Sequence, residues 1–129
     1  MHTKPLDGVK VLCVDDSQDS LALLTIVLKR SGAIVTSCGS GEDALRETVN
    51  RRFDVIISDL SMPPGMDGYD LAHALRAHQK ADGLASTPTL AVSGDANTPS
   101  DKRRFADFQV YMTKPFDQKH LVNIVERLK

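Results

Sequence analysis

Short apolar runs that suit β-strands alternate with longer amphipathic patterns that suit helices along the whole chain. The run Val-Ile-Ile-Ser at 55–58 is apolar at consecutive positions rather than at every second one. Continuous apolar character predicts a strand that is buried on both faces, as in a parallel sheet covered by helices. The predicted strands are Val9–Val14, Ile34–Ser37, Val55–Ser58, Thr89–Ser93 and Val110–Thr113.

Helices are predicted between these strands, and most have a recognisable first residue. Ser17 or Asp19 suits the N-cap of a helix over 17–31, and Gly32 suits its end because glycine adopts left-handed geometry freely. The other helices are predicted at 40–50, at 69–78 after a cap at Asp67, at 98–106, and after a cap at Asp117, with a polar loop over 79–87. Right-handed crossovers then predict an α/β fold: a five-stranded, parallel, doubly wound sheet in the order 2-1-3-4-5, the flavodoxin-like three-layer sandwich.

Composition limits the classes of function that the chain can have. Its 129 residues are the length of one domain, expected to span 1–129 with a core at about 8–128. The formal net charge of −1 excludes a broad basic face for nucleic acid. No apolar run is long enough to cross a membrane, no signal peptide is visible, and Cys13 and Cys38 form no paired framework. These features predict a soluble, cytoplasmic domain whose cysteines are buried and reduced.

Polar residues of a particular kind stand where the predicted strands end. The first strand ends in Asp15-Asp16, the third in Asp59, the fourth in Ser93 and the fifth in Lys114-Pro115. The carboxyl ends of parallel strands share one edge of the sheet, so three carboxylates are expected to converge at the switch point between the first and third strands. Such carboxylates repel unless a cation or a proton neutralises them, and an all-oxygen cluster suits Mg²⁺. A carboxylate beside Mg²⁺ and lysine is typical of a nucleophile that attacks a phosphoryl group and becomes an aspartyl-phosphate.

Four segments together resemble the receiver domains of two-component response regulators. They are VLCVDD at 11–16, SDLSMPPGMDG at 58–68, Ser93-Gly94 and YMTKPF at 111–116, and the similarity covers nearly the whole chain. The resemblance implies that Asp59 is the phosphoacceptor, that Lys114 pairs with the phosphoryl group and that Ser93 hydrogen-bonds one of its oxygens. It implies Mg²⁺ as the cofactor, with Asp16 as the main ligand, assisted by Asp15, the acceptor Asp59 and the backbone carbonyl of Ser61. Tyr111 matches the aromatic residue that changes rotamer with Ser93 on activation.

The resemblance implies a signalling switch rather than a turnover enzyme. The domain would accept a phosphoryl group from a histidine kinase or a histidine phosphotransfer domain, change conformation, and lose the group by slow self-dephosphorylation. Two contexts stay open: a complete single-domain regulator, or the receiver of a hybrid histidine kinase, which PLDGVKV at 5–11 and MDGYDLAHALR at 66–76 resemble. Direct nucleic-acid binding and membrane insertion are not expected, and the downstream target stays open.

Two other functions are compatible with the predicted fold. A flavodoxin-like module that binds FMN or another small ligand would need hydroxyl and amide donors after the first strand, where this chain has Asp-Asp-Ser-Gln-Asp at 15–19. A phosphatase of the aspartyl-phosphate type would want an acid–base aspartate two residues after the nucleophile, where Ser61 stands. A flavin absorbance spectrum and a phosphatase assay would separate these alternatives from the switch.

Three features depart from the usual receiver pattern. Pro64 adds a residue to the loop between Met62 and Gly68, which is expected to reshape the surroundings of the acceptor. The stretch from Ser93 to Lys114 is slightly short, and Thr98-Pro99 within it predicts a fourth helix that starts late. Asp107 stands where glycine is common, and aspartate enters the left-handed region less readily than glycine.

One face of the first predicted helix is a candidate partner surface. Spacing of three and four residues favours a core face made of Ser20, Leu23, Leu24, Val27, Leu28 and Ser31. An apolar patch then remains on the other side, made of Leu21, Ala22, Thr25 and Ile26. Exposed apolar patches rimmed by polar groups mark partner surfaces, and the resemblance implies that this helix packs on the helical bundle that carries the donor histidine. The alternative is a wide core face in which Leu21 and Ile26 are partly buried.

Overall fold

Five parallel strands form one sheet in the computed structural model, which describes residues 4–62, 65–94 and 107–129. The strands are β1 (Lys10–Val14), β2 (Ile34–Cys38), β3 (Val55–Ser58), β4 (Thr89–Ser93) and β5 (Val110–Thr113), in the order β2-β1-β3-β4-β5. β1 pairs with two strands, because Val11 lies opposite Val35 of β2 and Val55 of β3. The predicted parallel sheet and its strand order are confirmed, and the switch point lies beside β1 and β3.

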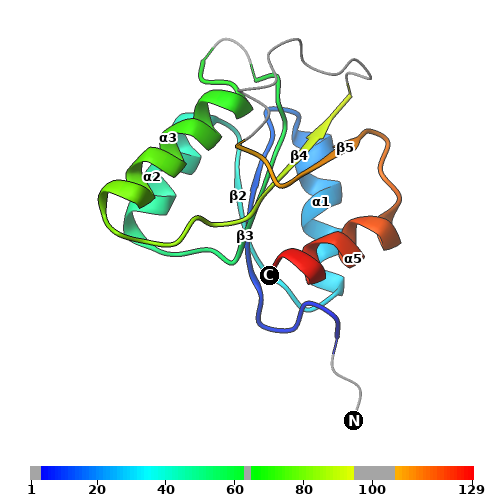
Figure 1. Cartoon of the computed structure of the whole chain (residues 1–129). Coiled ribbons are helices and arrows are strands. Elements are labelled where there is room, and N and C mark those ends of the chain that lie inside the picture. Colours follow the sequence, from blue (N-terminus) through cyan, green and yellow to red (C-terminus); the bar gives the residue numbers. More distant parts are fainter. Residues whose placement is uncertain (1–3, 63–64, 95–106) are drawn as a thin grey trace.

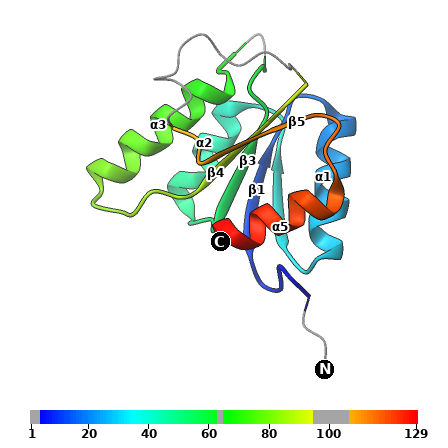
Figure 2. The same cartoon turned by 45° about the vertical axis from the view of Figure 1, so that its right-hand side comes forward.

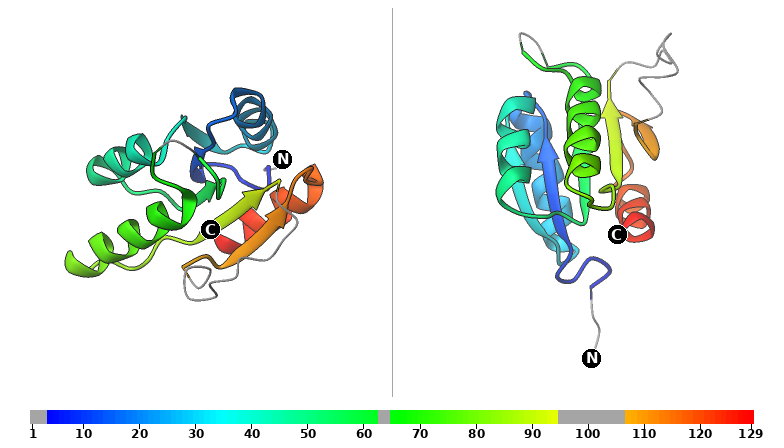
Figure 3. Two further views of the ribbon diagram at one scale, coloured as in Figure 1. Left: turned by 90° about the horizontal axis from the view of Figure 1, so that it is seen from above. Right: turned by 60° about the vertical axis from the view of Figure 1, so that its left-hand side comes forward.

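Helices cover both faces of this sheet (Figure 1 and Figure 2). α1 (Gln18–Arg30) and α5 (Gln118–Leu128) cover one face, and α2 (Gly41–Asn50) and α3 (Gly68–Ala81) cover the other (Figure 3). The N-cap side chains of these helices accept hydrogen bonds from N–H groups of the first turn, and they are Ser17, Ser40, Asp67 and Asp117. Such caps satisfy donors that no carbonyl within the helix can reach. The helix predicted over 98–106 lies outside the described residues.

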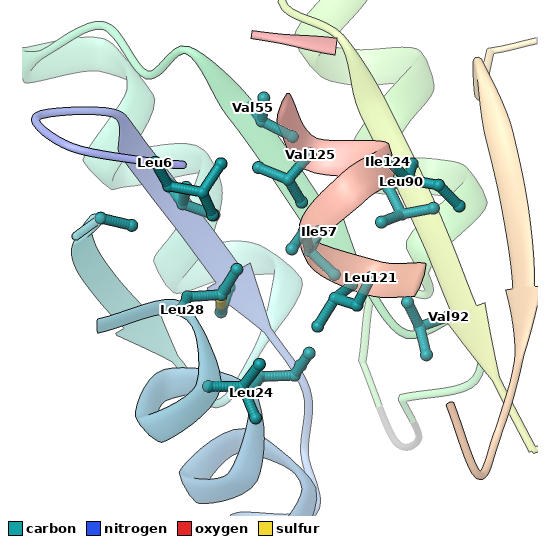
Figure 4. Close-up of a cluster of buried hydrophobic side chains, with 14 of the residues drawn as sticks. Leu6, Leu24, Leu28, Val55, Ile57, Leu90, Val92, Leu121, Ile124 and Val125 are labelled. Carbon is teal, nitrogen blue, oxygen red and sulfur yellow. The ribbon is translucent and has the colours of Figure 1, made fainter. Parts of the chain in front are cut away.

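The main hydrophobic core fills the space between the sheet and the α1/α5 layer (Figure 4). Ile57 of β3 and Val92 of β4 lie opposite Leu121 of α5, and Leu24 and Leu28 of α1 close the side of this cluster. A second core on the other face joins residues of β1 and β3 to α2 and α3, among them Leu12, Ile56, Leu71 and Leu75. Because successive side chains of a strand point to opposite faces, both faces of the central strands are buried. This burial holds the carboxyl ends of β1 and β3 in fixed positions.

α3 is longer than the sequence predicts. It continues to Ala81, whereas residues from 79 onward were expected to form a polar loop, so the prediction for 79–81 was wrong. Gln79 is buried; its side-chain amide donates to Thr87 Oγ1 at 2.7 Å and accepts the Thr87 backbone N–H at 3.0 Å. A glutamine is tolerated inside a protein when its amide groups are paired in this way. The polarity of Gln79 favoured a loop in the sequence analysis, because its partner Thr87 lies beyond the end of the helix and could not be identified from the sequence.

The predicted core face of α1 is correct only in part. Leu24, Val27 and Leu28 are buried, but Leu23 is 42% exposed. Leu21, predicted for the outer face, is half-buried and packs against the main core. Leu21, Leu24 and Leu28 are also spaced by three and four residues, so the periodicity alone allowed either set. Three apolar residues of α1 are exposed and form what we call the α1 patch: Ala22, Leu23 and Ile26.

Candidate functional site

Three carboxylates and one lysine meet at the carboxyl ends of β1, β3 and β5. One oxygen from each of Asp15, Asp16 and Asp59 lies within 4.8 Å of the other two. Lys114 Nζ lies 2.6 Å from Asp15 Oδ2 and 3.7 Å from Asp59 Oδ2. Each of these residues directly follows, or nearly follows, the end of a strand; β1 and β3 are largely buried, and β5 buries Met112. The sheet therefore brings together four of the residues that the sequence placed at strand ends.

The two neighbouring aspartates of this cluster differ in their surroundings. Asp15 is 1% exposed, and both of its carboxylate oxygens accept hydrogen bonds, Oδ1 from the Ser17 N–H at 2.9 Å and Oδ2 from Lys114. Asp16 is exposed, and no side-chain hydrogen bond or ion pair joins it to another residue in the described part of the chain. Asp16 therefore has free lone pairs for a cation, whereas Asp15 orients the lysine.

Asp59 is held firmly by the backbone around it. Its N–H donates to the Val14 carbonyl at 2.9 Å, and its Oδ1 accepts the Leu60 N–H at 2.8 Å. Its side chain is 11% exposed. Burial raises the pKa of the Asp59 carboxyl and the nearby Asp15 charge raises it further, while Lys114 and the N–H groups of Leu60 and Ser61 act in the opposite direction. The second oxygen of Asp59 faces Lys114.

Asp59→Asn is expected to raise the melting temperature in metal-free buffer at pH 7. Because the pKa of Asp59 is raised by folding, the folded state keeps this proton to higher pH than the unfolded chain, and stability falls as pH rises through that window. The amide removes this penalty and can still accept the Leu60 N–H. Each ~1 kcal/mol of penalty that the amide removes raises the melting temperature by about 4 °C in a domain of this size, so the gain is measurable.

The pH profile of this gain provides the check. Thermal melts of both proteins should show the gain shrinking as pH falls below the folded pKa, where wild-type Asp59 is itself neutral. A gain that stays constant down to the most acidic pH at which both proteins fold would contradict the assignment to this carboxyl.

Gly68 allows the loop after Asp59 to return to the sheet. Its N–H donates to the Leu60 carbonyl at 2.9 Å, and a Cβ on Gly68 would lie 2.1 Å from the Asp59 carbonyl oxygen. No residue with a side chain can occupy this position without moving the acceptor. From the sequence, Gly68 had no predicted role of its own. A signal was present, because most other residues have a higher helix propensity than glycine, and a glycine at the first position of a helix therefore indicates close approach of another backbone segment.

The remaining predicted site residues lie on β4, on β5 and in the loop after β3. Ser93 is buried at the end of β4, and its carbonyl accepts the Lys114 N–H at 2.7 Å. Tyr111 of β5 lies opposite Ala91 and packs, half-buried, against the small cluster that includes Leu60. Ser61 is exposed, two residues after Asp59. All of them lie on elements that adjoin the carboxylate cluster.

The donor set fits Mg²⁺. The cluster offers only oxygen ligands, and its carboxylate oxygens are close enough to share one small ion. Mg²⁺ takes one or two carboxylates and keeps several waters, which agrees with one free carboxylate, Asp16, beside two that are held by the protein. Asp16 would be the main ligand of the ion, with Asp15 and Asp59 beside it and the carbonyl of Ser61 as the backbone ligand.

Two other expectations concern residues beside the site. Among the described residues only glycines have left-handed φ angles, so Asp107 takes ordinary backbone geometry although glycine is common at this position in the receiver pattern. Its carboxylate instead lies 3.5 Å from His73 Nδ1 and 3.7 Å from Arg76. Cys13 and Cys38 are buried and unpaired, and burial raises the pKa of Cys13 to about 12, so its thiol stays protonated. Pro64 lies outside the described residues.

Many known proteins are similar to this chain in sequence or in fold. The family model of the response regulator receiver domain matches residues 11–126. The sensor protein GacS of Pseudomonas syringae pv. syringae is 32% identical over 118 residues, which are 90% of this chain but 13% of GacS, so the chain spans a small part of this curated relative. The chemotaxis protein CheY4 of Vibrio cholerae superposes with a TM-score of 0.82 at 31% identity, covering 95% of this chain and 99% of CheY4.

A further solved structure bears on the metal. The receiver domain of the sensor histidine kinase PA1611 of Pseudomonas aeruginosa superposes with a TM-score of 0.80 at 25% identity, covering 94% of this chain and 97% of that one. That receiver coordinates a magnesium ion in its active site cleft. Within the ranges that the structure describes, no helix is long and apolar enough to span a bilayer.

Proposed function

The chain belongs to the family of response regulator receiver domains of two-component systems, and from this premise we propose that it accepts a phosphoryl group on Asp59 with Mg²⁺ as its cofactor. The observation that supports the proposal best is the cluster of three carboxylates with Lys114 beside it. We further propose that the chain forms one receiver domain with its core at about 8–128, and that it works in the cytoplasm.

The proposed chemistry is a direct transfer between two side chains. An Asp59 carboxylate oxygen forms a bond to phosphorus while the bond from phosphorus to the donor histidine nitrogen breaks, and the imidazole leaves with that electron pair. Lys114, 3.7 Å from Asp59 Oδ2, is placed to neutralise a phosphoryl oxygen, and Ser93 supplies a hydroxyl donor at the neighbouring strand end. Bound Mg²⁺ supplies positive charge to the phosphoryl oxygens. The domain thereby modifies itself and turns over no separate substrate except by slow self-dephosphorylation.

Mass spectrometry of the intact protein tests this function. With a small-molecule phosphodonor and Mg²⁺, the chain is expected to gain one phosphoryl group, and EDTA is expected to prevent the gain. Wild-type protein that stays unlabelled with Mg²⁺ present would overturn the proposal. Labelling that persists in EDTA would contradict the metal requirement.

The proposed response to phosphorylation is a coupled movement of Ser93 and Tyr111. When Ser93 turns toward a phosphoryl oxygen, it leaves space into which the half-buried Tyr111 ring can turn. The domain then has two packing arrangements, with the ring turned outward or inward, and the phosphoryl group shifts the equilibrium between them. The ring signals of Tyr111 in NMR spectra are expected to move when beryllofluoride, a phosphoryl mimic, saturates the site. An unchanged Tyr111 at saturation would argue decisively against this switch.

The proposed donor is a phosphohistidine on a histidine kinase or a histidine phosphotransfer domain. GacS, of which this chain matches a small part, is a sensor protein, and PA1611 is a sensor histidine kinase with a receiver domain of its own. These relatives support the hybrid-kinase context, and the similarity to the chemotaxis protein CheY4 supports the single-domain context. The competing FMN-binding interpretation suits the site poorly, because an exposed Asp16 carboxylate lies where a phosphate would bind.

A further inference from the structure

The loop that follows Asp59 is fixed at its base by the sheet and by α3. The Gly68 N–H closes the loop onto the Leu60 carbonyl, and the start of α3 is capped reciprocally. In this cap Asp67 Oδ1 accepts the Asp70 N–H at 2.8 Å, and Asp70 Oδ2 accepts the Asp67 N–H at 3.3 Å. These contacts fix where the loop ends, but they do not reach its outer limb at Gly65 and Met66.

The outer limb is held by α2, an element on the other side of the loop. Glu42 Oε1 accepts the Met66 backbone N–H at 2.6 Å. The same carboxylate lies against Gly65, because a Cβ there would be 2.5 Å from Oε1 and 3.1 Å from Oε2. A Cβ on Gly41 would lie 3.0 Å from Met66 Cγ, and the Met66 side chain packs against the second core. Two consecutive residues of α2 therefore contact two consecutive residues of the loop.

Helix formation alone does not explain the position of the Glu42 side chain. An acidic residue in the first turn of a helix is favoured by the helix dipole wherever its side chain points. The next residue, Asp43, serves the helix itself, since its N–H is capped by Ser40 and its carboxylate pairs with Arg46. Glu42 instead turns to the loop, and the hydrogen bond from the Met66 N–H lowers the pKa of its carboxyl.

We infer that Glu42 is a positioning residue: by holding Gly65 and Met66 it favours the arrangement of the site that binds Mg²⁺ and accepts the phosphoryl group. The inference rests on the proposed function of Asp59. The loop also carries Ser61, whose backbone carbonyl is one of the proposed Mg²⁺ ligands.

The test compares two substitutions of Glu42 in the whole chain. Glu42→Ala removes the acceptor of the Met66 N–H. The affinity for Mg²⁺ is then expected to fall about tenfold, which is the lower end of the range for groups that orient metal ligands. The affinity is measured from amide NMR signals during titration with Mg²⁺ alone. The initial rate of labelling by a small phosphodonor at subsaturating Mg²⁺ should fall by a similar factor. Glu42→Gln keeps an oxygen acceptor for the Met66 N–H and should recover most of both values.

A control and a second variant separate the anchor from general damage. Glu47→Ala on the same helix removes a partly exposed carboxylate whose ion-pair partner is Arg51 rather than a described loop residue, so it should behave like wild type. Gly65→Ala leaves Glu42 intact but places a Cβ where the carboxylate lies, so it should weaken Mg²⁺ binding as Glu42→Ala does. Both substitutions break the same contact between Glu42 and the loop, so the double variant Glu42→Ala/Gly65→Ala should bind Mg²⁺ no more weakly than either single variant.

Each result decides between the two proposals. Wild type that binds no Mg²⁺ and takes no label overturns the function of the site. Wild type that is labelled, together with Glu42→Ala and Gly65→Ala variants that keep wild-type Mg²⁺ affinity, overturns the role of Glu42 alone. Additive losses in the double variant overturn it as well, because independent effects add. If Glu42→Ala fails to fold, Gly65→Ala alone carries the decision, with its melting temperature as the check on folding.

Discussion

Asp59→Asn is expected to abolish labelling by a small phosphodonor, with the intact mass unchanged where wild type gains one phosphoryl group. The amide oxygen is a poor nucleophile and lacks the negative charge that forms the bond to phosphorus, so the rate should fall by at least ~10³-fold. The fold should persist, since the substituted amide can still accept the Leu60 N–H that orients this side chain. The measurement is a time course of intact mass with Mg²⁺ in excess.

Asp54→Asn is the matched control for this substitution. Asp54 is exposed, lies just before the other end of β3, and accepts the Lys10 N–H at 2.8 Å, so the variant loses one carboxylate at the far edge of the sheet. It should be labelled like wild type. Equal labelling of Asp59→Asn and wild type would sink the assignment of the acceptor, and loss of labelling in Asp54→Asn would show that the assay reports on stability.

Ala22→Glu combined with Ile26→Glu is expected to reduce transfer from the cognate phosphohistidine protein about 100-fold, the effect of losing two well-packed interface contacts. Both residues belong to the α1 patch, whose helix begins beside Asp16, and Ile26 is 48% exposed in the free chain. Glutamates there would be desolvated on docking without a partner charge. Labelling by a small phosphodonor and the melting temperature should stay near wild type, because neither residue is buried in the core.

This prediction revises the partner surface that the sequence indicated. Leu21 and Thr25 of the predicted patch are half-buried, so glutamate at Leu21 would disturb the main core and confuse docking with folding. Val49→Glu supplies the control, because Val49 is 62% exposed on α2, on the opposite face of the sheet. Equal loss of both labelling routes in the α1 variant, or equal loss of transfer in Val49→Glu, would rule out specific docking on the α1 patch.

Much of the fold and of the candidate site could be predicted because both depend on local pattern. A run such as Val55–Ser58 can be stable only where both faces are buried. Five strands that alternate with helices, three of them of this kind, therefore leave few arrangements other than a parallel sheet with two helical layers. Once the strands are parallel, their last residues must share one edge. Asp15, Asp59 and Lys114 therefore lie together as a consequence of topology, and their chemistry could be stated before any distance was known.

Other features were decided only by contacts between distant segments. The periodicity of α1 is compatible with either Leu21 or Leu23 in the core, because both sets have the spacing of a helix. Packing against the neighbouring elements buries Leu21 in part and leaves Leu23 exposed. The polar side chain of Gln79 predicted a loop. In the structure Gln79 is buried in α3, which is possible only because its amide pairs with Thr87, eight residues away.

The same holds within the site. The order of residues along the chain decides which charges gather at the edge of the sheet, but the distances between the folded elements decide how those charges pair. Lys114 lies closer to Asp15 than to Asp59, so its charge only partly offsets the burial and the Asp15 charge that raise the pKa of the Asp59 carboxyl. The hydrogen bond from Met66 to Glu42 joins residues 24 positions apart, and no spacing rule relates them. Pairings of this kind depend on how whole helices and strands pack. One hydrogen bond contributes little free energy compared with the burial of the apolar faces of these elements, and it is this burial that brings the two partners together.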